Sequence, residues 1–392
     1  MDVGLNRPAR RRTPRVVVAS AGKFHAYHLA RAAQAAGCLE RFVTTVFDAA
    51  EPDIPRERVV ELRWPAYAAR AIAKMPGNRS QAWSYYVGDN WFDRRAAAYA
   101  ADADIYHAFN HQALHGLRAA RRAGAVSIVE RASAHPDVQH ALLQDEFARV
   151  GLPSPTADSR LRDKHLREYD EADVIVVPSS FVYRSMVDRG VPATKLRQIP
   201  LGVSVDAFSP GTKRDGVFRV VFAGALSLQK GLPYLLEAFR LAALPPATSE
   251  LVLIGDAFPE ARAFLPDYRG TYRHVPFVPH AQLLQEYRQA SVFVLPSLQD
   301  GFGMVVYEAA ACGLPVIVSD HVGAEIRDGR DGFVVPVRNA AAIAERLVYL
   351  HTHEHERRAL GASARELALR FTWQRYGRAI ADLYEDVWQD RA

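Results

Sequence analysis

Short apolar runs recur along this chain and alternate with segments that favour helices. A short apolar run that ends at glycine or proline predicts a buried strand. The predicted strands are residues 15–20, 41–47, 104–109, 125–129, 173–177, 218–222, 251–254, 292–295 and 316–319. The predicted helices include residues 24–36, 113–124, 232–241, 304–312 and 371–388, and most of 137–173. Because strands that alternate with helices favour parallel sheets, we expect an α/β protein.

The stretch from Pro296 to Val318 is the most informative part of the chain. An apolar strand over residues 292–295 ends at Pro296, and a short loop with two glycines follows. Residues 304–312 contain no helix breaker and several alanines, so they predict a helix. Gly313 and the proline that follows end that helix, and residues 316–319 predict the next strand. The stretch is therefore one strand, loop, helix and strand unit.

This loop predicts a site for a phosphorylated sugar. The start of a helix offers unpaired backbone N–H groups and a partial positive charge, which suit a phosphate. Gly301 and Gly303 allow the backbone to approach that phosphate closely. Asp300 and Glu308 are carboxylates and cannot bind phosphate directly. They are suited to accept hydrogen bonds from sugar hydroxyls, one from a ribose and the other from a transferred sugar.

The composition limits the classes of protein to which this chain can belong. With 392 residues, we expect two domains, and 49% apolar residues can form two cores. Two cysteines do not suggest a disulfide framework and fit a reducing compartment, so we expect a cytoplasmic protein. We find no run of 18 apolar residues in the sequence and expect no transmembrane helix.

Charge is concentrated in the first half of the chain. Residues 1–200 carry 29 Lys and Arg against 22 Asp and Glu, whereas residues 201–392 carry 20 against 22. A basic half suggests an anionic partner, although a solvated basic surface explains the charge equally well. Basic residues and aromatics also mix over residues 48–95, which favours either a membrane-interface segment or a pair of helices packed on the sheet. No nucleic-acid-binding motif is recognisable, so we expect no nucleic-acid partner.

The motif around Asp300 resembles a known family. Asp300, seven residues and Glu308, with Gly-Phe-Gly after the first acid and Cys-Gly-Leu-Pro after the second, resemble the E-x7-E signature of the retaining glycosyltransferases of family 4. Residues 191–210 resemble the passage between the two domains of that family. The resemblance is strong over about 170–370 and weaker over 15–135. Asp300 departs from the usual Glu, and Ala225 stands where the family usually has Arg.

The resemblance implies the GT-B fold, in which two Rossmann-like α/β domains face a cleft. We expect an acceptor-binding domain over residues 1–203, a nucleotide-sugar domain over 204–370 and a last helix over 371–392 that crosses back to the first domain. The implied function is retaining transfer of a sugar from a UDP- or GDP-linked donor to a glycan or lipid-linked acceptor, with peripheral membrane contact through the basic first domain. The alternative is a nucleotide-sugar-binding relative, namely an epimerase, a phosphorylase or a non-catalytic module.

The resemblance also implies the site residues. We expect His135, Asp300 and Lys230 to take part in catalysis, with His107 as the second candidate for the active-site histidine. Residues implied to bind the nucleotide sugar are Gly22, Lys230, Phe277, Asp300, Gly301, Phe302, Gly303, Met304, Val305 and Glu308. The pair Asp102 and Asp104 precedes a predicted strand, so it is interpreted as a turn rather than a metal motif. We therefore expect no metal and no separate cofactor.

Overall fold

The computed structural model describes residues 12–48, 53–75, 80–154 and 159–390. By its contacts the chain divides into two units. The first comprises Met1–Glu130, Asp163–Val174 and Gly377–Ala392, and the second comprises Arg131–Arg162 and Ile175–Tyr376. The domain limits inferred from the sequence stay a prediction. In this division residues 131–162 group with the second unit, although they precede residue 203.

The first sheet has seven strands in the order β3-β2-β1-β4-β5-β6-β7. Its strands are β1 (Val16–Ser20), β2 (Leu39–Thr44), β3 (Val59–Glu61), β4 (Ile105–Phe109), β5 (Val126–Glu130), β6 (Val174–Val177) and β7 (Leu196–Gln198). Strand β1 pairs in parallel with β2 on one side and with β4 on the other. This crossover at β1 is typical of a Rossmann-like sheet, in which ligands bind at the carboxyl ends of the strands.

The second sheet repeats the crossover, with the order β10-β9-β8-β11-β12-β13. Its strands are β8 (Phe218–Ala223), β9 (Ser249–Ile254), β10 (Arg273–Val275), β11 (Val292–Leu295), β12 (Val316–Ser319) and β13 (Gly332–Val335). The side chains of β11 and β12 are buried throughout, as expected for parallel strands covered on both faces. The expected fold of two parallel-sheet, Rossmann-like units is thus confirmed.

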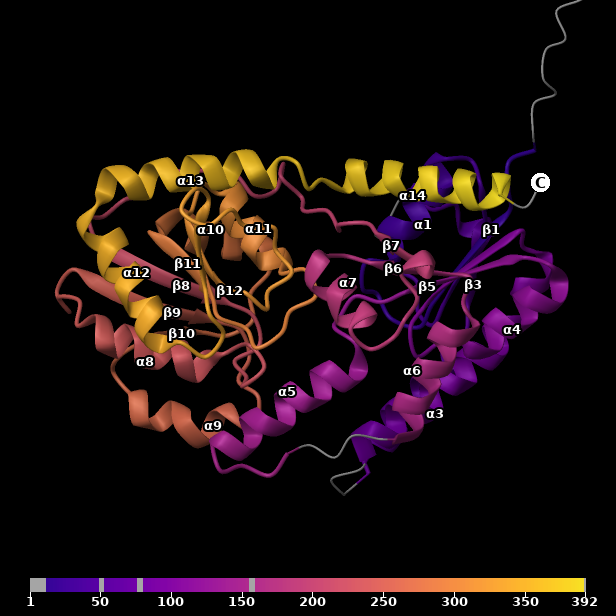
Figure 1. Ribbon diagram of the computed structural model, residues 1–392, viewed down its shortest axis with the longest axis horizontal. Helices are drawn as coiled ribbons and strands as arrows, with labels where there is room; N and C mark the ends of the chain where they lie inside the picture. Colours follow the sequence, from indigo (N-terminus) through magenta and orange to yellow (C-terminus); the bar gives the residue numbers. More distant parts are fainter. Residues whose placement is uncertain (1–11, 49–52, 76–79, 155–158, 391–392) are drawn as a thin grey trace, which may run out of the picture. The chain divides into compact units, whose positions relative to one another are not determined.

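Helices connect the strands in both sheets. In the first half of the chain they are α1 (Ala26–Ala35), α2 (Arg63–Ala73), α3 (Ser80–Ala96), α4 (Leu114–Ala123), α5 (Pro136–Arg149), α6 (Ser159–Glu171) and α7 (Ser180–Val187). In the second half they are α8 (Leu232–Ala242), α9 (Ala261–Phe264), α10 (His280–Gln289), α11 (Met304–Ala311), α12 (Ala340–Thr352), α13 (Glu354–Ala368) and α14 (Trp373–Gln389). Helix α8 packs beside α12 and helix α11 beside α13, and Figure 1 shows strands of the second sheet between these two pairs.

The predicted elements agree with the structure where breakers delimit them. The strands at 292–295 and 316–319 have the predicted bounds, and α11 differs from its prediction by one residue. Residues 48–95 contain the helices α2 and α3, which pack against each other, whereas the packing of this pair on the sheet stays a prediction. The short strands β3, β7, β10 and β13 were not predicted. Among the described helices, none is long and apolar enough to cross a membrane.

Candidate functional site

The loop after β11 is fixed by close backbone packing. A Cβ atom on Gly301 would lie 1.8 Å from the carbonyl oxygen of Ala132, so no larger residue fits without a shift of the backbone. Ser179 Oγ donates a hydrogen bond to the Gly301 carbonyl oxygen at 2.6 Å. Gly303 has φ +69° and is the N-cap residue of α11. The two glycines predicted to bring the backbone close to a ligand are thus required by the loop itself.

Asp300 and Lys230 form the charged centre of this loop. Asp300 Oδ1 accepts hydrogen bonds from the backbone N–H groups of Gly303 at 2.9 Å and Phe302 at 3.3 Å. Its other oxygen, Oδ2, accepts from Lys230 Nζ at 2.5 Å. A carboxylate next to a helix N-terminus is favoured by the helix dipole. The structure therefore brings together three predicted features, which are the first acid, the lysine and the glycine loop.

Helix α11 offers further donors beyond those that Asp300 uses. Met304 and Val305 are its first two residues, and the first N–H groups of a helix have no partner within it. Lys230 directly precedes Gly231, the N-cap residue of α8. The ammonium group of Lys230 therefore lies at the start of one helix and contacts the loop that starts another. This arrangement of a cation and helix N-termini suits a phosphate group.

Glu308 is a buried carboxylate on α11. Glu308 is 5% exposed, and burial raises the pKa of its carboxyl group to about 7. No hydrogen bond to this carboxylate is formed by the residues that the structure describes. A largely buried carboxylate that forms no such bonds is costly in its charged form, because burial removes most of its contact with water. Glu308 thus has the features of a residue that awaits a hydrogen-bonding ligand.

Two aromatic residues of the predicted site differ in what they can contact. The Phe302 ring is buried and stacks on Tyr307 with 4.8 Å between the ring centroids, so only the backbone of Phe302 is suited to face a ligand. Phe277, by contrast, is 75% exposed and follows strand β10. Its backbone N–H donates to Asp256 Oδ1 at 3.4 Å. An exposed ring at the carboxyl end of a strand is available for stacking.

His135 is buried at the start of helix α5. Its Nδ1 accepts a hydrogen bond from the backbone N–H of Asp137 at 3.2 Å, which makes it the N-cap residue. Its own backbone N–H donates to Ser185 Oγ at 3.0 Å. Burial lowers the pKa of His135 to about 4, so the ring is neutral near pH 7. Because Nδ1 accepts a hydrogen bond in the neutral ring, the proton resides on Nε2, which is a hydrogen-bond donor.

The segment before His135 packs directly against the loop that contains Asp300. Ala132 limits the space at Gly301, and Ser133 Oγ donates to Gln299 Oε1 at 3.2 Å. Both segments belong to the second unit. The structure thus places the predicted histidine segment beside the predicted nucleotide-sugar loop, although the two are far apart in sequence.

His107, the second candidate, is a core residue. It lies inside β4 and is fully buried. Its Nδ1 lies 2.9 Å from the hydroxyl of Tyr384, and burial lowers the pKa of His107 to about 4.

The first unit also contains Gly22, in the turn after β1, where Lys23 forms an ion pair with Asp48 at 2.7 Å.

Several polar residues at the carboxyl ends of the first sheet were not predicted. His25 is buried, and its Nε2 lies 3.1 Å from Glu130 Oε1. His111 follows β4 in a left-handed conformation with φ +64°, and its Nδ1 lies 2.7 Å from Asp89 Oδ2. The position of Glu130 at the end of a predicted strand was the available signal, since ligands of α/β sheets bind there.

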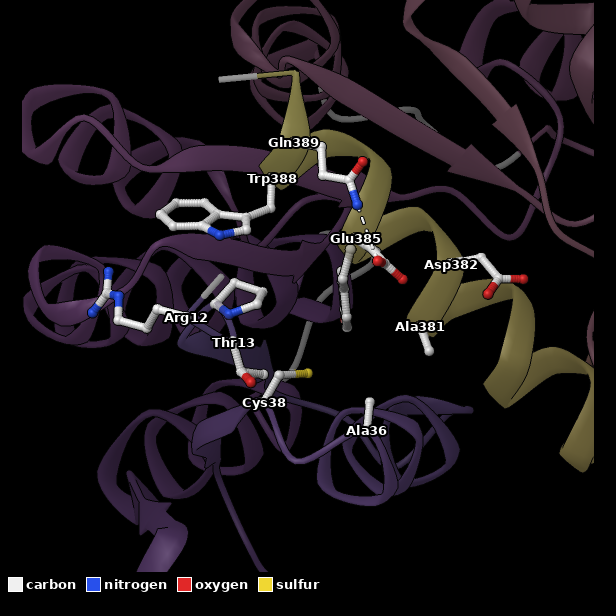
Figure 2. Close-up of a pocket in the computed structure, with 11 residues that line it drawn as sticks. Arg12, Thr13, Ala36, Cys38, Ala381, Asp382, Glu385, Trp388 and Gln389 are labelled. Carbon is white, nitrogen blue, oxygen red and sulfur yellow. Dashed lines mark hydrogen bonds between the residues drawn. The ribbon is translucent and has the colours of Figure 1, made fainter. Parts of the chain in front are cut away.

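A cavity of about 290 Å³ lies at the amino ends of strands in the first sheet (Figure 2). It is lined by residues before β1 and β2 and by the last turns of α14, among them Arg12, Cys38, Asp382, Glu385 and Trp388. The Arg12 guanidinium lies 5.7 Å from the centre of the Trp388 ring. None of the predicted site residues lines this cavity, and it lies at the amino ends of the strands rather than at the carboxyl ends.

Known proteins with similar sequences include glycosyltransferases. A D-inositol 3-phosphate glycosyltransferase of Corynebacterium jeikeium is 30% identical over 245 residues, which cover 56% of this chain and 58% of that protein. A GDP-mannose-dependent alpha-(1-6)-phosphatidylinositol monomannoside mannosyltransferase of Mycolicibacterium smegmatis is 28% identical over 288 residues, which cover 67% of this chain and 71% of that protein. The match to the first of these relatives spans less than two thirds of its length.

Solved structures and family models agree as well. Sucrose-phosphate synthase from Thermosynechococcus elongatus matches with a TM-score of 0.73 and 21% identity over 96% of this chain and 99% of that chain. HepE from Anabaena, solved with UDP-glucose, matches with a TM-score of 0.67 and 17% identity over 95% and 100%. Both likenesses support the GT-B fold. Residues 23–207 match the model described as Glycosyltransferase Family 4, and residues 217–353 match the model described as Glycosyl transferases group 1. The chain therefore belongs to family 4 of the glycosyltransferases.

Proposed function

We propose that this protein is a retaining glycosyltransferase that moves a sugar from a UDP- or GDP-linked donor to an acceptor. The observation that carries the proposal is the contact between Lys230 and Asp300 at the starts of two helices, close to the loop that leads to His135. Lys230 supplies a positive charge and α11 supplies free N–H groups for a diphosphate. The relatives and neighbouring structures support the same chemistry, since one is named for GDP-mannose and another was solved with UDP-glucose.

We assign the diphosphate to Lys230 and the N–H groups of Met304 and Val305. In the structure the Asp300 carboxylate neutralises Lys230. A diphosphate carries more negative charge than one carboxylate, so it can attract the ammonium group away from Asp300. Asp300 is then released to accept hydrogen bonds from hydroxyls of the transferred sugar. Because Asp300 is one methylene shorter than the usual Glu, it reaches less far toward that sugar.

We assign the ribose to Glu308 and the base to the loop at Phe277. Two neighbouring hydroxyls can donate to one carboxylate, which would satisfy the buried oxygens of Glu308. The exposed Phe277 ring offers a surface on which a base can stack.

In the proposed reaction the bond between C1 of the sugar and the diphosphate oxygen breaks. A bond from C1 to the acceptor oxygen forms on the same face, and the acceptor proton passes to the leaving diphosphate. Charge develops on the leaving oxygen, so Lys230 and the N–H groups of α11 supply the main electrostatic stabilisation. His135 donates through Nε2 to the sugar near the reacting carbon. This scheme requires no metal and no separate cofactor.

We propose a glycan or lipid-linked acceptor and peripheral membrane contact through helices α2 and α3. Pro65 is the buried residue of α2, whereas Trp64 is 72% exposed and Tyr67 is 46% exposed. Further exposed apolar residues are Met75, Tyr85 and Trp91. Basic residues on α2 and next to it, Arg63, Arg70 and Lys74, complement an anionic lipid surface. We place the protein in the cytoplasm on the grounds of its two buried, unpaired cysteines.

A panel of nucleotide sugars tests the proposal. We expect slow hydrolysis of one UDP- or GDP-linked sugar without acceptor, with the released sugar first appearing in the anomeric configuration of the donor. Proton NMR distinguishes this outcome from inversion. Epimerised or phosphorolysed products would assign the alternative enzymes, and binding without any turnover would assign a non-catalytic module.

A further inference from the structure

Helix α5 lies early in the sequence but packs within the second unit. At its first residue it is capped by His135, and the segment before that cap contacts Gly301 and Gln299. Its second turn is also tied to this segment, because Gln139 Oε1 accepts from Arg131 Nη2 at 3.3 Å. The start of α5 is therefore held against the loop that contains Asp300.

The other end of α5 is held by three residues that we name the α5 clamp, which are Glu146, Tyr234 and Arg338. Glu146 is fully buried, and its two oxygens accept from the Tyr234 hydroxyl at 2.8 and 3.1 Å. Arg338 Nε donates to Glu146 Oε2 at 2.8 Å. Tyr234 lies in the first turn of α8, and Arg338 follows β13. The clamp thus joins α5 to the helix that begins just after Lys230.

The clamp has features that packing alone does not require. A buried ion pair is a poor way to stabilise a fold, since apolar residues of the same volume stabilise it as well or better. Arg338 also adopts a left-handed backbone conformation with φ +65°, which is unfavourable for a residue with a side chain. Strain of this kind persists only where the surroundings impose it, and it is frequent near functional sites. The clamp therefore serves to hold α5 in one position rather than to make the core more stable.

We propose that Glu146, Tyr234 and Arg338 are positioning residues that fix His135 against the Asp300 to Gly303 loop through helix α5. The inference rests on the proposed function for its catalytic meaning, but the position of His135 can be measured independently. A rigid α5 keeps the His135 ring buried and correctly placed for the sugar. A small misplacement of a catalytic group lowers the rate strongly, whereas binding of the nucleotide depends on other residues.

Glu146→Gln and Tyr234→Phe are the test variants, and Asp145→Asn is the matched control. Asp145 precedes Glu146 and also pairs with Arg338, at 2.7 Å, but its side chain is 49% exposed. The first readout is the pH titration of His135 by NMR, which needs no nucleotide sugar. The pKa of His135, about 4 in the intact protein, is expected to rise toward 6.5 in the test variants and to stay unchanged in the control. Burial is the main cause of this low pKa, and the charged groups that also contribute are Asp137, Arg131, Arg189 and Arg162, none of which the test variants alter.

The second readout is nucleotide-sugar turnover. We expect kcat to fall about tenfold or more in Glu146→Gln, with the Kd of the nucleotide unchanged and with the Asp145→Asn control close to the parent protein. Arg338→Lys, which keeps the charge but loses the planar group, is expected to fall between the parent and Arg338→Gln. If Glu146→Gln does not fold, Tyr234→Phe, which removes a single oxygen, decides the question.

The outcomes separate the two proposals. If the test variants lower the melting temperature but leave both the His135 titration and kcat unchanged, the clamp is structural and the inference is wrong. If the parent protein turns over no nucleotide sugar, the proposed function fails, and the titration alone decides whether the clamp positions His135.

Discussion

Replacing Glu308 by Gln should weaken nucleotide binding and strengthen the empty fold at the same time. The folded-state pKa of Glu308 is about 7, above the ordinary 4.5 of an unfolded chain. Its contribution to stability is therefore fully present below pH 4.5 and is lost as the pH rises through 7. The difference between these two pKa values corresponds to about 3 kcal/mol at pH 8. Gln at this position carries no charge and should recover part of that free energy.

Nucleotide binding should show the opposite change. Hydrogen bonds to a charged group contribute roughly 1.5–3 kcal/mol, so Glu308→Gln should raise the Kd for UDP or GDP about 10- to 150-fold at pH 8. In the parent protein, binding requires the ionised carboxylate. Each pH unit below 7 should therefore weaken binding by up to about tenfold. In the Gln variant this pH dependence should disappear.

Calorimetric titrations and thermal melts at pH 6, 7 and 8 measure both effects. The matched control is Glu168→Gln, because burial raises the pKa of Glu168 to about 7 as well. Glu168 differs in that it accepts hydrogen bonds from Asn110 Nδ2 and from three backbone N–H groups, so this variant should lose stability and bind nucleotide normally. If Glu308→Gln binds nucleotide as the parent does, or loses stability as the control does, then Glu308 is a structural residue.

Four further variants test the remaining assignments. Lys230→Ala should weaken the binding of a nucleoside diphosphate. In the parent protein, a chelator should leave turnover unchanged. Turnover that stops in the chelator and returns with Mn²⁺ would contradict metal independence. His135→Ala should lower kcat more than nucleotide affinity, as expected of a contact made mainly in the transition state, whereas His107→Ala should mainly lower the melting temperature; the reverse pattern would exchange their roles. Gly301→Ala should impair both folding and nucleotide binding, since its Cβ would lie 1.8 Å from the Ala132 carbonyl oxygen; unchanged melts and Kd values would show that the loop can relax.

The elements around Asp300 could be predicted almost residue by residue. Apolar runs bounded by proline and glycine determine the strand over 292–295, and the breaker-free segment from 304 determines α11. These signals are local, so they are readable in a single sequence. The contact between Asp300 and Lys230 was not predicted, because it depends on the pairing of β8 with β11 in the sheet.

Contacts between distant segments could not be predicted. His107 and His135 lie in or after apolar strands, and the burial of His107 and its contact with the Tyr384 hydroxyl of the last helix identify it as a core residue. The clamp at Glu146 likewise depends on Tyr234 and Arg338, which lie far along the chain. The capping role of Asp300 was also missed, because its carboxylate was assigned to a sugar and not to the N–H groups of its own loop.

The central claim is that the second unit binds a nucleotide sugar through its diphosphate, and thermal melts with UDP and GDP test it most directly. A ligand that binds only the folded state at a hundredfold excess over its Kd adds roughly 2.7 kcal/mol to the free energy of unfolding. For a domain of this size each kcal/mol raises the melting temperature by about 2–4 °C. We therefore predict a rise of several degrees with one nucleotide, smaller with the other, and largely lost in Lys230→Ala. A melting temperature that neither UDP, GDP nor ADP changes at millimolar concentration would contradict the account.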